Sequence, residues 1–508
     1  MEILSLAERA QSTPNALALD DLTRQRSWAE LWDRVRRIAR FLCDELELQP
    51  GDHVATLMEN RVECFELMLG AIHAGVWLAP INWHLTQEEI AYVALDCGAK
   101  AIFTDEGFED RARACHPGPV LRVGKPLDRR LAAASDEPMP LDGPAGGPLI
   151  YTSGTTGYPK GVKRNRGGNL GEVLLAQQRV AGDLGVIGMG PHLVTGPCYH
   201  AAPLMFPIYA QAAGAPIIAM PRWDAQSALR LLMEREIGQT HVVPTMFIRL
   251  LALPEDERAA FHAPALRRVI HGAAPISPQV KRRMIDWWGP ILVEYWGATE
   301  SGIITLVEST DWLANQETVG RALPPWEVFA TDDAGRRLPP GENGLLYARH
   351  AKHPRIFEYH DDEEKTAASY LEPYVFHIGD IGRVDAEGWV YLADRKSHTI
   401  ISGGVNIYPA EIENALQTHP AVADVGVFGV PDDEWGESVK AAVELAPGYQ
   451  ASPALEAELR AHVREQLAGY KVPRSVDFHA QLPRQSSGKL YIRRLKAPYW
   501  EGRNRQIG

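Results

Sequence analysis

Strand-like and helix-like segments alternate along most of this sequence, and this alternation limits the fold more than any other feature. Short apolar runs at 53–57, 76–81 and 100–103 are separated by segments with helical spacing at 61–74 and 86–96. Apolar runs followed by amphipathic segments are typical of β–α units in a largely parallel sheet. The pattern therefore predicts an α/β fold.

The same alternation returns in the middle of the chain. Strands are expected at 216–220, 241–243 and 266–271, and helices at 224–236 and 278–288. An aspartate opens the first of these helices, at the position where an N-cap side chain accepts a backbone N–H bond. The repeated alternation favours α/β layers with substantial parallel sheet, and periodicity alone predicts no more than a large α/β enzyme.

Composition limits the class of protein further. The chain has 508 residues, of which 45% are hydrophobic and 23% are charged, so we expect a globular protein with more than one domain. The formal net charge of −13 argues against a nucleic-acid surface. An acidic total does not exclude small anionic ligands, because these need only local donors.

The cysteines and the chain ends carry few signals. The five cysteines form no CxxC pair, so neither a zinc ribbon nor a redox motif is expected, and such a sparse set is typical of a reducing, cytoplasmic environment. The opening MEILSLAERA has no signal-peptide pattern, and the closing RNRQIG is no peroxisomal or prenylation signal. No apolar stretch is long enough for a transmembrane segment.

A smaller unit follows a polar, turn-rich stretch at 386–404. We place the boundary near 394–397, which divides the chain into 1–394 and 395–508. In the smaller unit we expect strands at 423–430, 439–445 and 475–478 and a helix at 457–467.

The strongest local motif is YTSGTTGYPKG at 151–161, directly after an apolar run. Hydroxyls and backbone N–H groups gather around Gly154 and Gly157, and Lys160 lies near the end. Glycine lets the backbone approach a ligand closely, so this loop can wrap phosphate oxygens. Its spacing is not that of a Walker A loop. Judged on glycine, serine and threonine content alone, a polar surface loop would explain it equally well.

The full string resembles the signature of the adenylate-forming superfamily, which includes acyl- and aryl-CoA ligases, peptide-synthetase adenylation domains and beetle luciferases. The resemblance covers nearly the whole chain and favours the acyl-CoA synthetase, or fatty-acid–CoA ligase, branch. It implies a large α/β N-terminal domain of several subdomains with layered sheets and helices, and a small mobile α+β C-terminal domain. It also implies a triphosphate site at Thr152, Ser153, Gly154, Thr155, Thr156, Gly157 and Lys160.

The string EYWGATE at 294–300 resembles the superfamily's (Y/W)GxTE core. The resemblance implies that Tyr295 or Trp296 stacks on adenine beside Gly297, that Thr299 bonds phosphate, and that Glu300 holds Mg²⁺. Oxygen ligands suit this hard cation, which usually binds through one or two carboxylates plus substrate phosphates. Core packing would explain a lone tryptophan, and a solvated strand end a lone glutamate, but neither explains the whole string.

Two further segments carry candidate pocket residues. In HGAAP at 271–275, the small residues Gly272, Ala273 and Ala274 leave room for a flat ring against the backbone. YHAAPL at 199–204 resembles the loop before the acyl pocket, which implies that His200 borders the carboxylate and the thiol's route. A lone histidine would more often be a core or surface residue.

Elements near the domain boundary resemble the ribose site and the hinge. Asp380 and Arg395 are implied to reach the ribose hydroxyls, although Ile378 replaces the family's threonine. Ser397 departs from the family's hinge pattern, so the pivot residue stays open. SGGVNIYPAEIE at 402–413 resembles the loop that moves to the CoA-binding position and implies contacts from Gly403 and Gly404.

QSSGK at 485–489 resembles the C-terminal catalytic-lysine segment. A lone exposed lysine is nearly always only a solvated charge, but the LPR before it and the SGK context favour a catalytic Lys489. The segments YKVPR at 470–474 and EWGE at 434–437 also fit the small domain of CoA ligases.

These motifs predict a ligase dependent on ATP and Mg²⁺ that forms an acyl-adenylate and then an acyl-CoA thioester, with Lys489, Glu300 and Thr299 catalytic. Its partners would be small molecules (ATP, CoA and a carboxylic acid), and a homo-oligomer is allowed. Three alternatives stay open: transfer to a carrier-protein phosphopantetheine, an oxidative second step, and a non-enzymatic nucleotide-binding protein. No carrier domain is visible, which favours free CoA.

The sequence gives only a coarse prediction of the acid. The pocket is expected around 244–247 and 301–305, with Thr245, Ser301 and Ile303 on its wall. We find no arginine or lysine placed for a second carboxylate. This favours a fatty or other bulky apolar monocarboxylic acid.

Overall fold

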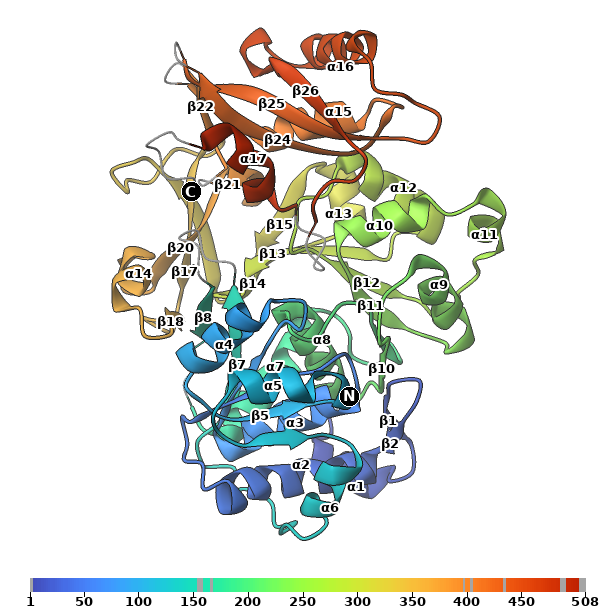
Figure 1. Ribbon diagram of the computed structural model, residues 1–508, viewed down its shortest axis with the longest axis vertical. Coiled ribbons are helices and arrows are strands. Elements are labelled where there is room, and N and C mark those ends of the chain that lie inside the picture. Colours follow the sequence, from blue (N-terminus) through green and yellow to red (C-terminus); the bar gives the residue numbers. More distant parts are fainter. Residues whose placement is uncertain are drawn as a thin grey trace.

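The computed structural model describes residues 3–152, 159–164, 168–395, 398–402, 405–432, 435–484 and 490–501. Figure 1 shows the N-terminal segments at the bottom of the molecule, a large sheet across its middle, and a small C-terminal unit at the top. Layered sheets and helices followed by a small α+β unit confirm the predicted fold class. No helix in the described part has the length and apolar character needed to cross a membrane.

The first sheet contains the predicted early β–α units. Its inner strands are parallel, and its last two pairings, β7 with β8 and β8 with β18, are antiparallel. In spatial order its strands are β18 (Phe357–Tyr359), β8 (Lys160–Arg164), β7 (Gly147–Thr152), β4 (Trp77–Pro80), β3 (His53–Leu57), β5 (Ala99–Thr104) and β6 (Val120–Arg122). The β7–β8 hairpin therefore holds both ends of the predicted phosphate loop.

The second sheet is parallel from β1 to β13 and antiparallel beyond β13. From one edge, the strands in spatial order are β2 (Gln25–Ser27), β1 (Leu17–Asp20), β10 (Ile217–Ala219), β9 (His192–Val194), β11 (Gln239–Val242), β12 (Arg268–His271) and β13 (Leu292–Ala298). The sheet continues through β14 (Gly302–Glu308), β15 (Thr318–Ala322), β21 (Trp389–Arg395), β20 (Val375–Val384), β17 (Gly344–His350) and β16 (Trp326–Thr331), and β19 (Tyr370–Glu372) also pairs with β20.

Helices fill the space between the two sheets and cover their outer faces. All thirteen residues of α3 (Val62–Ala74) are buried, and one hydrophobic cluster joins it to strands of both sheets. With it pack α2 (Trp28–Arg40), α7 (Leu170–Asp183) and α8 (Ala201–Ala212). Outside lie α4 (Gln87–Asp96) and α5 (Glu109–Cys115) on the first sheet, and α9 (Ala225–Glu234), α10 (Pro244–Leu251), α12 (Pro278–Trp288) and α13 (Ser309–Ala314) on the second.

Helix α3 also buries two carboxylates that the sequence did not single out. The side chains of Glu63 and Glu66 have no exposed surface. Arg24 bonds Glu63 at 2.6 Å, and Arg26 bonds Glu66 at 2.7 Å. Because a buried carboxylate needs a paired cation, this network explains how polar residues fit between the sheets.

The C-terminal unit has its own sheet and core. Its strands are β23 (Val405–Ile407), β22 (Ile400–Ser402), β25 (Gly436–Leu445), β24 (Val422–Asp432) and β26 (Ser475–His479), and its helices are α15 (Pro409–Gln417), α16 (Pro453–Gln466) and α17 (Ile492–Trp500). Its main hydrophobic cluster contains only residues from this unit. The division at 394/395 stays a prediction.

The stretch 386–404 differs from the turn-rich segment that the sequence predicted. Residues 389–395 form β21, which pairs with β20 and β15 inside the large sheet. Trp389 and Val390 belong to two different hydrophobic clusters, so the strand is covered on both sides. Because polar residues interrupt its apolar pattern, the sequence did not indicate that this strand is buried.

We expect Lys281→Met to destabilise the large domain. Lys281 has no exposed surface and bonds Glu294 of β13 at 2.5 Å. Removing one partner of a buried ion pair strands the other charge, at a cost of about 3 kcal/mol. A thermal melt followed by circular dichroism should show a melting temperature several degrees lower. Arg283→Met, an exposed neighbour on α12, is the control, and equal melting of the two variants would contradict this role.

Candidate active site

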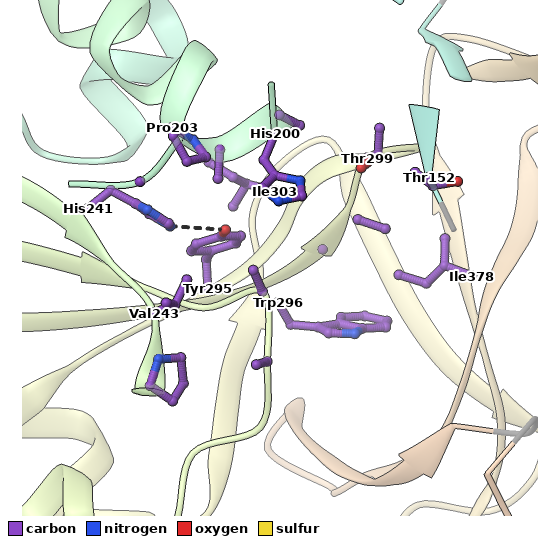
Figure 2. A pocket seen from close by; sticks show the side chains of 18 of the residues that line it. Thr152, His200, Pro203, His241, Val243, Tyr295, Trp296, Thr299, Ile303 and Ile378 are labelled. Atoms are coloured by element: carbon purple, nitrogen blue, oxygen red, sulfur yellow. Dashed lines mark hydrogen bonds between the residues drawn. The ribbon is translucent and has the colours of Figure 1, made fainter. Parts of the chain in front are cut away.

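Described residues of most segments that carry the predicted motifs line one cavity of about 3790 Å³. Since a typical small-molecule pocket measures roughly 300–1,000 Å³, this cavity has room for more than one ligand. Figure 2 shows His241 and Tyr295 on one side, Thr152 and Ile378 on the opposite side, and Trp296 between them. We call these the ring end and the nucleotide end.

Strand β13 supplies residues to both ends. Successive strand side chains point to opposite faces, and accordingly Tyr295 and Trp296 belong to different hydrophobic clusters. The Trp296 indole N–H donates to Asp380 Oδ2 at 2.7 Å, and both side chains are buried. Asp380 pairs in the backbone ladder with Arg395, whose side chain lies outside the described residues. The predicted adenine and ribose contacts are thus joined on the nucleotide end.

Tyr295 lies with aromatic residues at the ring end. Its hydroxyl lies 3.3 Å from His241 Nε2, and its ring centroid is 5.1 Å from that of Phe206. Phe206 stacks on His241 with centroids 4.7 Å apart. Burial lowers the pKa of His241 to about 3, so this imidazole is neutral at neutral pH. The ring end therefore offers aromatic surface without a cation at its centre.

The 272–274 segment shapes the wall through its backbone. A Cβ at Gly272 would lie 2.7 Å from both Cε1 and the carbonyl oxygen of Tyr295, so Gly272 makes room for Tyr295 and does not line the cavity. Ala273 has φ of 65°, a left-handed conformation that costs a non-glycine residue roughly 1–3 kcal/mol. Such strain gathers at ligand sites, and Ala273 and Ala274 both line the cavity.

A charged group surrounds Glu300. The Tyr359 hydroxyl donates to Glu300 Oε1 at 2.8 Å, and the Lys365 ammonium lies 4.0 Å from the centre of the Tyr359 ring. Lys160 Nζ lies 3.4 Å from Asp362 Oδ2. Burial lowers the pKa of Lys365, and the carboxylates of Glu300 and Asp362 oppose that shift. Sequence reasoning missed Tyr359 and Lys365, which no motif distinguishes.

The oxygen donors fit a metal held jointly with substrate. Among the described residues there is no group of three or more His, Cys, Asp or Glu side chains able to hold a metal. Mg²⁺ rarely needs such a cage, because it keeps several waters and binds through one or two carboxylates plus phosphates. The carboxylate of Glu300 and the hydroxyl of Thr299, both on the cavity wall, suit this mode.

The structure brings most of the predicted residues together, while their individual roles stay predictions. The cavity is lined by Thr152, His200, Thr245, Ala273, Ala274, Tyr295, Trp296, Gly297, Thr299, Glu300, Ser301, Ile303 and Asp380. Lys160 and Gly272 do not line it. Outside the described residues lie Ser153, Gly154, Thr155, Thr156, Gly157, Gly403, Gly404 and Lys489.

Several arginines on the wall were not indicated by the sequence. Among them are Arg179, Arg222 and Arg249. Arg222 bonds Glu59 at 2.6 Å, and the exposed Arg249 lies 5.7 Å over the Trp223 ring. Arg222 and Arg249 thus each have a partner outside the aromatic cluster at the ring end.

Comparison with known proteins agrees with this geometry. The profile for "AMP-binding enzyme" matches residues 6–353, and that for "AMP-binding enzyme C-terminal domain" matches 411–489. A fatty acid–[acyl-carrier-protein] ligase of Streptomyces coeruleorubidus is 31% identical, over 98% of this chain and 96% of that protein. A feruloyl-CoA synthase of an Amycolatopsis species is 33% identical, over 95% and 96%.

A solved structure is similar over the same extent. The o-succinylbenzoate CoA synthetase of Bacillus subtilis, in complex with an acyl-adenylate intermediate, has a TM-score of 0.81 and 28% identity. The match covers 97% of both chains. That synthetase has also been solved with ATP and a magnesium ion.

The fold and the matched profiles together define a nucleotide-binding enzyme with a large N-terminal and a small C-terminal part. The chain belongs to the AMP-binding enzyme family. This membership confirms the predicted superfamily and its acyl-CoA synthetase branch, and the enzyme is an AMP-forming acid–thiol ligase.

We expect Gly272→Ala to impair the ring end. The added methyl group would collide with the ring and the carbonyl oxygen of Tyr295, and neither the buried ring nor the strand backbone can yield cheaply. The KM for the acid should rise at least several-fold in steady-state kinetics. Gly469→Ala, where a Cβ meets open space, is the matched control. Unchanged kinetics for Gly272→Ala would mean that Tyr295 does not shape the pocket.

Proposed function

We propose that this enzyme joins a monocarboxylic acid with an apolar body to CoA, through an acyl-adenylate, with ATP and Mg²⁺. One observation carries the proposal: a single cavity combines a nucleotide end, with the Trp296–Asp380 pair and Glu300, and a neutral, ring-lined end. Trp296 rather than Tyr295 is the adenine platform, because Tyr295 packs among the ring-end aromatics.

The first half-reaction forms the acyl-adenylate. An oxygen of the ionised carboxylate attacks the α-phosphorus of ATP, and the bond to the bridging β-phosphate oxygen breaks as pyrophosphate leaves. No general base is needed, because the acid is already deprotonated. The barrier lies in bringing anions together, so catalysis consists of positioning and charge neutralisation.

Several groups supply this neutralisation. Bound Mg²⁺ would offset the negative charge of the triphosphate, held beside Glu300 and Thr299. The 152–160 loop would surround the phosphates, and Lys489 would lie between the acyl carboxylate and the α-phosphate. Residues 153–158 and Lys489 lie outside the described part, so these two roles rest on the family resemblance alone.

The second half-reaction transfers the acyl group to a thiol. The sulfur of CoA attacks the acyl carbonyl, the bond from that carbon to AMP breaks, and the thiol proton passes to water. Movement of the C-terminal unit would withdraw Lys489 and bring Gly403 and Gly404 to the thiol's path.

Transfer to a carrier protein is the second candidate. It is favoured by the similarity to the Streptomyces carrier-protein ligase, which covers 98% of this chain. The similarity to the feruloyl-CoA synthase favours free CoA to the same degree. The two candidates share the first half-reaction and differ only in the acceptor.

The nature of the ring end supports an apolar acid. Phe206, Tyr209 and Tyr295 are all less than a tenth exposed and all line the cavity, and His241 among them is neutral. Burying apolar surface contributes roughly 25 cal/mol per Å². None of these four side chains is a cation that could pair with a second carboxylate of the acid.

We expect AMP and pyrophosphate to form only when ATP, Mg²⁺ and a suitable acid are all present. Chromatography of the nucleotide products across a panel of long-chain, aromatic and dicarboxylic acids measures this. Apolar monoacids should give the highest kcat/KM. Production of ADP and phosphate alone would refute adenylation. Adding CoA or a phosphopantetheinylated carrier protein separates the two acceptors, and thioester formed only on the carrier would reverse our assignment.

We expect Lys489→Ala to separate the two half-reactions. Because the variant lacks a preorganised charge in the adenylating state, its rate of acyl-adenylate formation should fall by a factor of about 10²–10³. Supplied with ready-made acyl-AMP, the variant should form the thioester at a nearly normal rate. Ser397→Pro is the complementary variant, because proline fixes φ at the proposed hinge and should slow thioester formation more. Equal losses in both steps for Lys489→Ala would argue against domain movement.

A further inference from the structure

Five polar residues beside the phosphate hairpin come from distant parts of the chain. Glu300 follows β13, Lys160 begins β8, and Tyr359 ends β18. Asp362 and Lys365 lie at the start of α14 (Glu363–Ala368), directly after β18. Antiparallel pairing of β18 with β8 brings Tyr359 and the start of α14 close to Lys160. Glu300, Tyr359 and Lys365 line the cavity.

Tyr359 is held from several sides. Its backbone N–H donates to Thr366 Oγ1 at 2.9 Å. In the β18–β8 ladder, Tyr359 pairs with Val162. Its hydroxyl donates to Glu300 Oε1 at 2.8 Å. One carboxylate oxygen of Glu300 is therefore oriented by a rigid aromatic group, and the other can face a ligand.

Lys365 is placed differently from the other lysine of the group. Lys160 pairs with Asp362 at 3.4 Å, whereas the Lys365 ammonium lies over the Tyr359 ring. Within the described residues, Lys365 has no ion pair of its own. Its backbone N–H donates to Asp362 Oδ1 at 3.0 Å, which fixes the start of the helix. The ammonium thus faces the cavity near Glu300, with an aromatic ring as its support.

We propose that Lys365 is a catalytic residue that binds the terminal phosphates of ATP, and that Tyr359 is a positioning residue for the Glu300 carboxylate. This proposal rests on the proposed function, since it assumes a triphosphate at the nucleotide end. With Mg²⁺ held by Glu300, the Lys365 ammonium would be left without that carboxylate and would lie free to bind the terminal phosphates. As pyrophosphate leaves, its oxygens gain charge, and a fixed ammonium beside them lowers the barrier.

Lys365→Met tests the catalytic part. Methionine keeps the length and apolar stem but removes the charge. The rate of AMP formation should fall about 100-fold, and inhibition by added pyrophosphate should weaken, with the KM for the acid unchanged. Lys365→Arg should recover part of the rate. Lys163→Met is the matched control: Lys163 also lies over an aromatic ring, Trp77, at 5.7 Å, but does not line the cavity.

Tyr359→Phe tests the positioning part while keeping the ring. Calorimetric titration of ATP at several Mg²⁺ concentrations, without acid, should show that the variant needs about tenfold more Mg²⁺ for the same affinity. This readout does not require turnover. Thermal melts confirm that the variants fold.

The outcomes separate this inference from the proposed function. If the unmodified enzyme forms no AMP with any acid, the proposed function fails. If it forms AMP and Lys365→Met matches Lys163→Met in rate and pyrophosphate inhibition, the role of Lys365 is overturned. If Tyr359→Phe binds ATP with unchanged Mg²⁺ dependence, the role of Tyr359 is overturned.

Discussion

The architecture of the site depends on strand β13. It is parallel to β12 and antiparallel to β14, so it lies where the large sheet changes direction. The buried pair of Glu294 and Lys281 holds it against α12. Alternation along the strand then sends Tyr295 and Trp296 to different sides, and the chain leaves the strand at Thr299 and Glu300. One strand thereby fixes the relative positions of both ends of the cavity.

The hydrogen bond from Trp296 to Asp380 connects β13 to the antiparallel half of the sheet. Asp380 belongs to β20, which pairs with β21, the strand that leads into the C-terminal unit. The nucleotide end is consequently built from both halves of the sheet. Any displacement of β20 relative to β13 would move the proposed ribose acceptor away from the adenine platform. This geometry gives the chain a physical reason to bury both side chains.

Local patterns in the sequence predicted several of the regular elements with their bounds. The predicted helix at 278–288 and strand at 53–57 have the bounds of α12 and β3, because apolar spacing and capping act over a few residues. Tyr359 and Lys365 could not be predicted, since only the pairing of β18 with β8 brings them to Glu300. Glu63 and Glu66 likewise look like a solvated helix face until Arg24 and Arg26 are seen to bury them.

The distribution of charge along the cavity orients a substrate. At the nucleotide end, the charged side chains of Glu300 and Lys365 line the cavity, whereas at the ring end burial keeps His241 neutral beside Phe206. A molecule with one carboxylate and an apolar body has a single favourable orientation in such a gradient. For the proposed acid, the carboxylate would lie toward the phosphates and the body among the rings, because the reverse would bury a charge without a partner. In the proposed reaction, this difference in charge between the two ends would by itself place the carboxylate of the acid beside the α-phosphate.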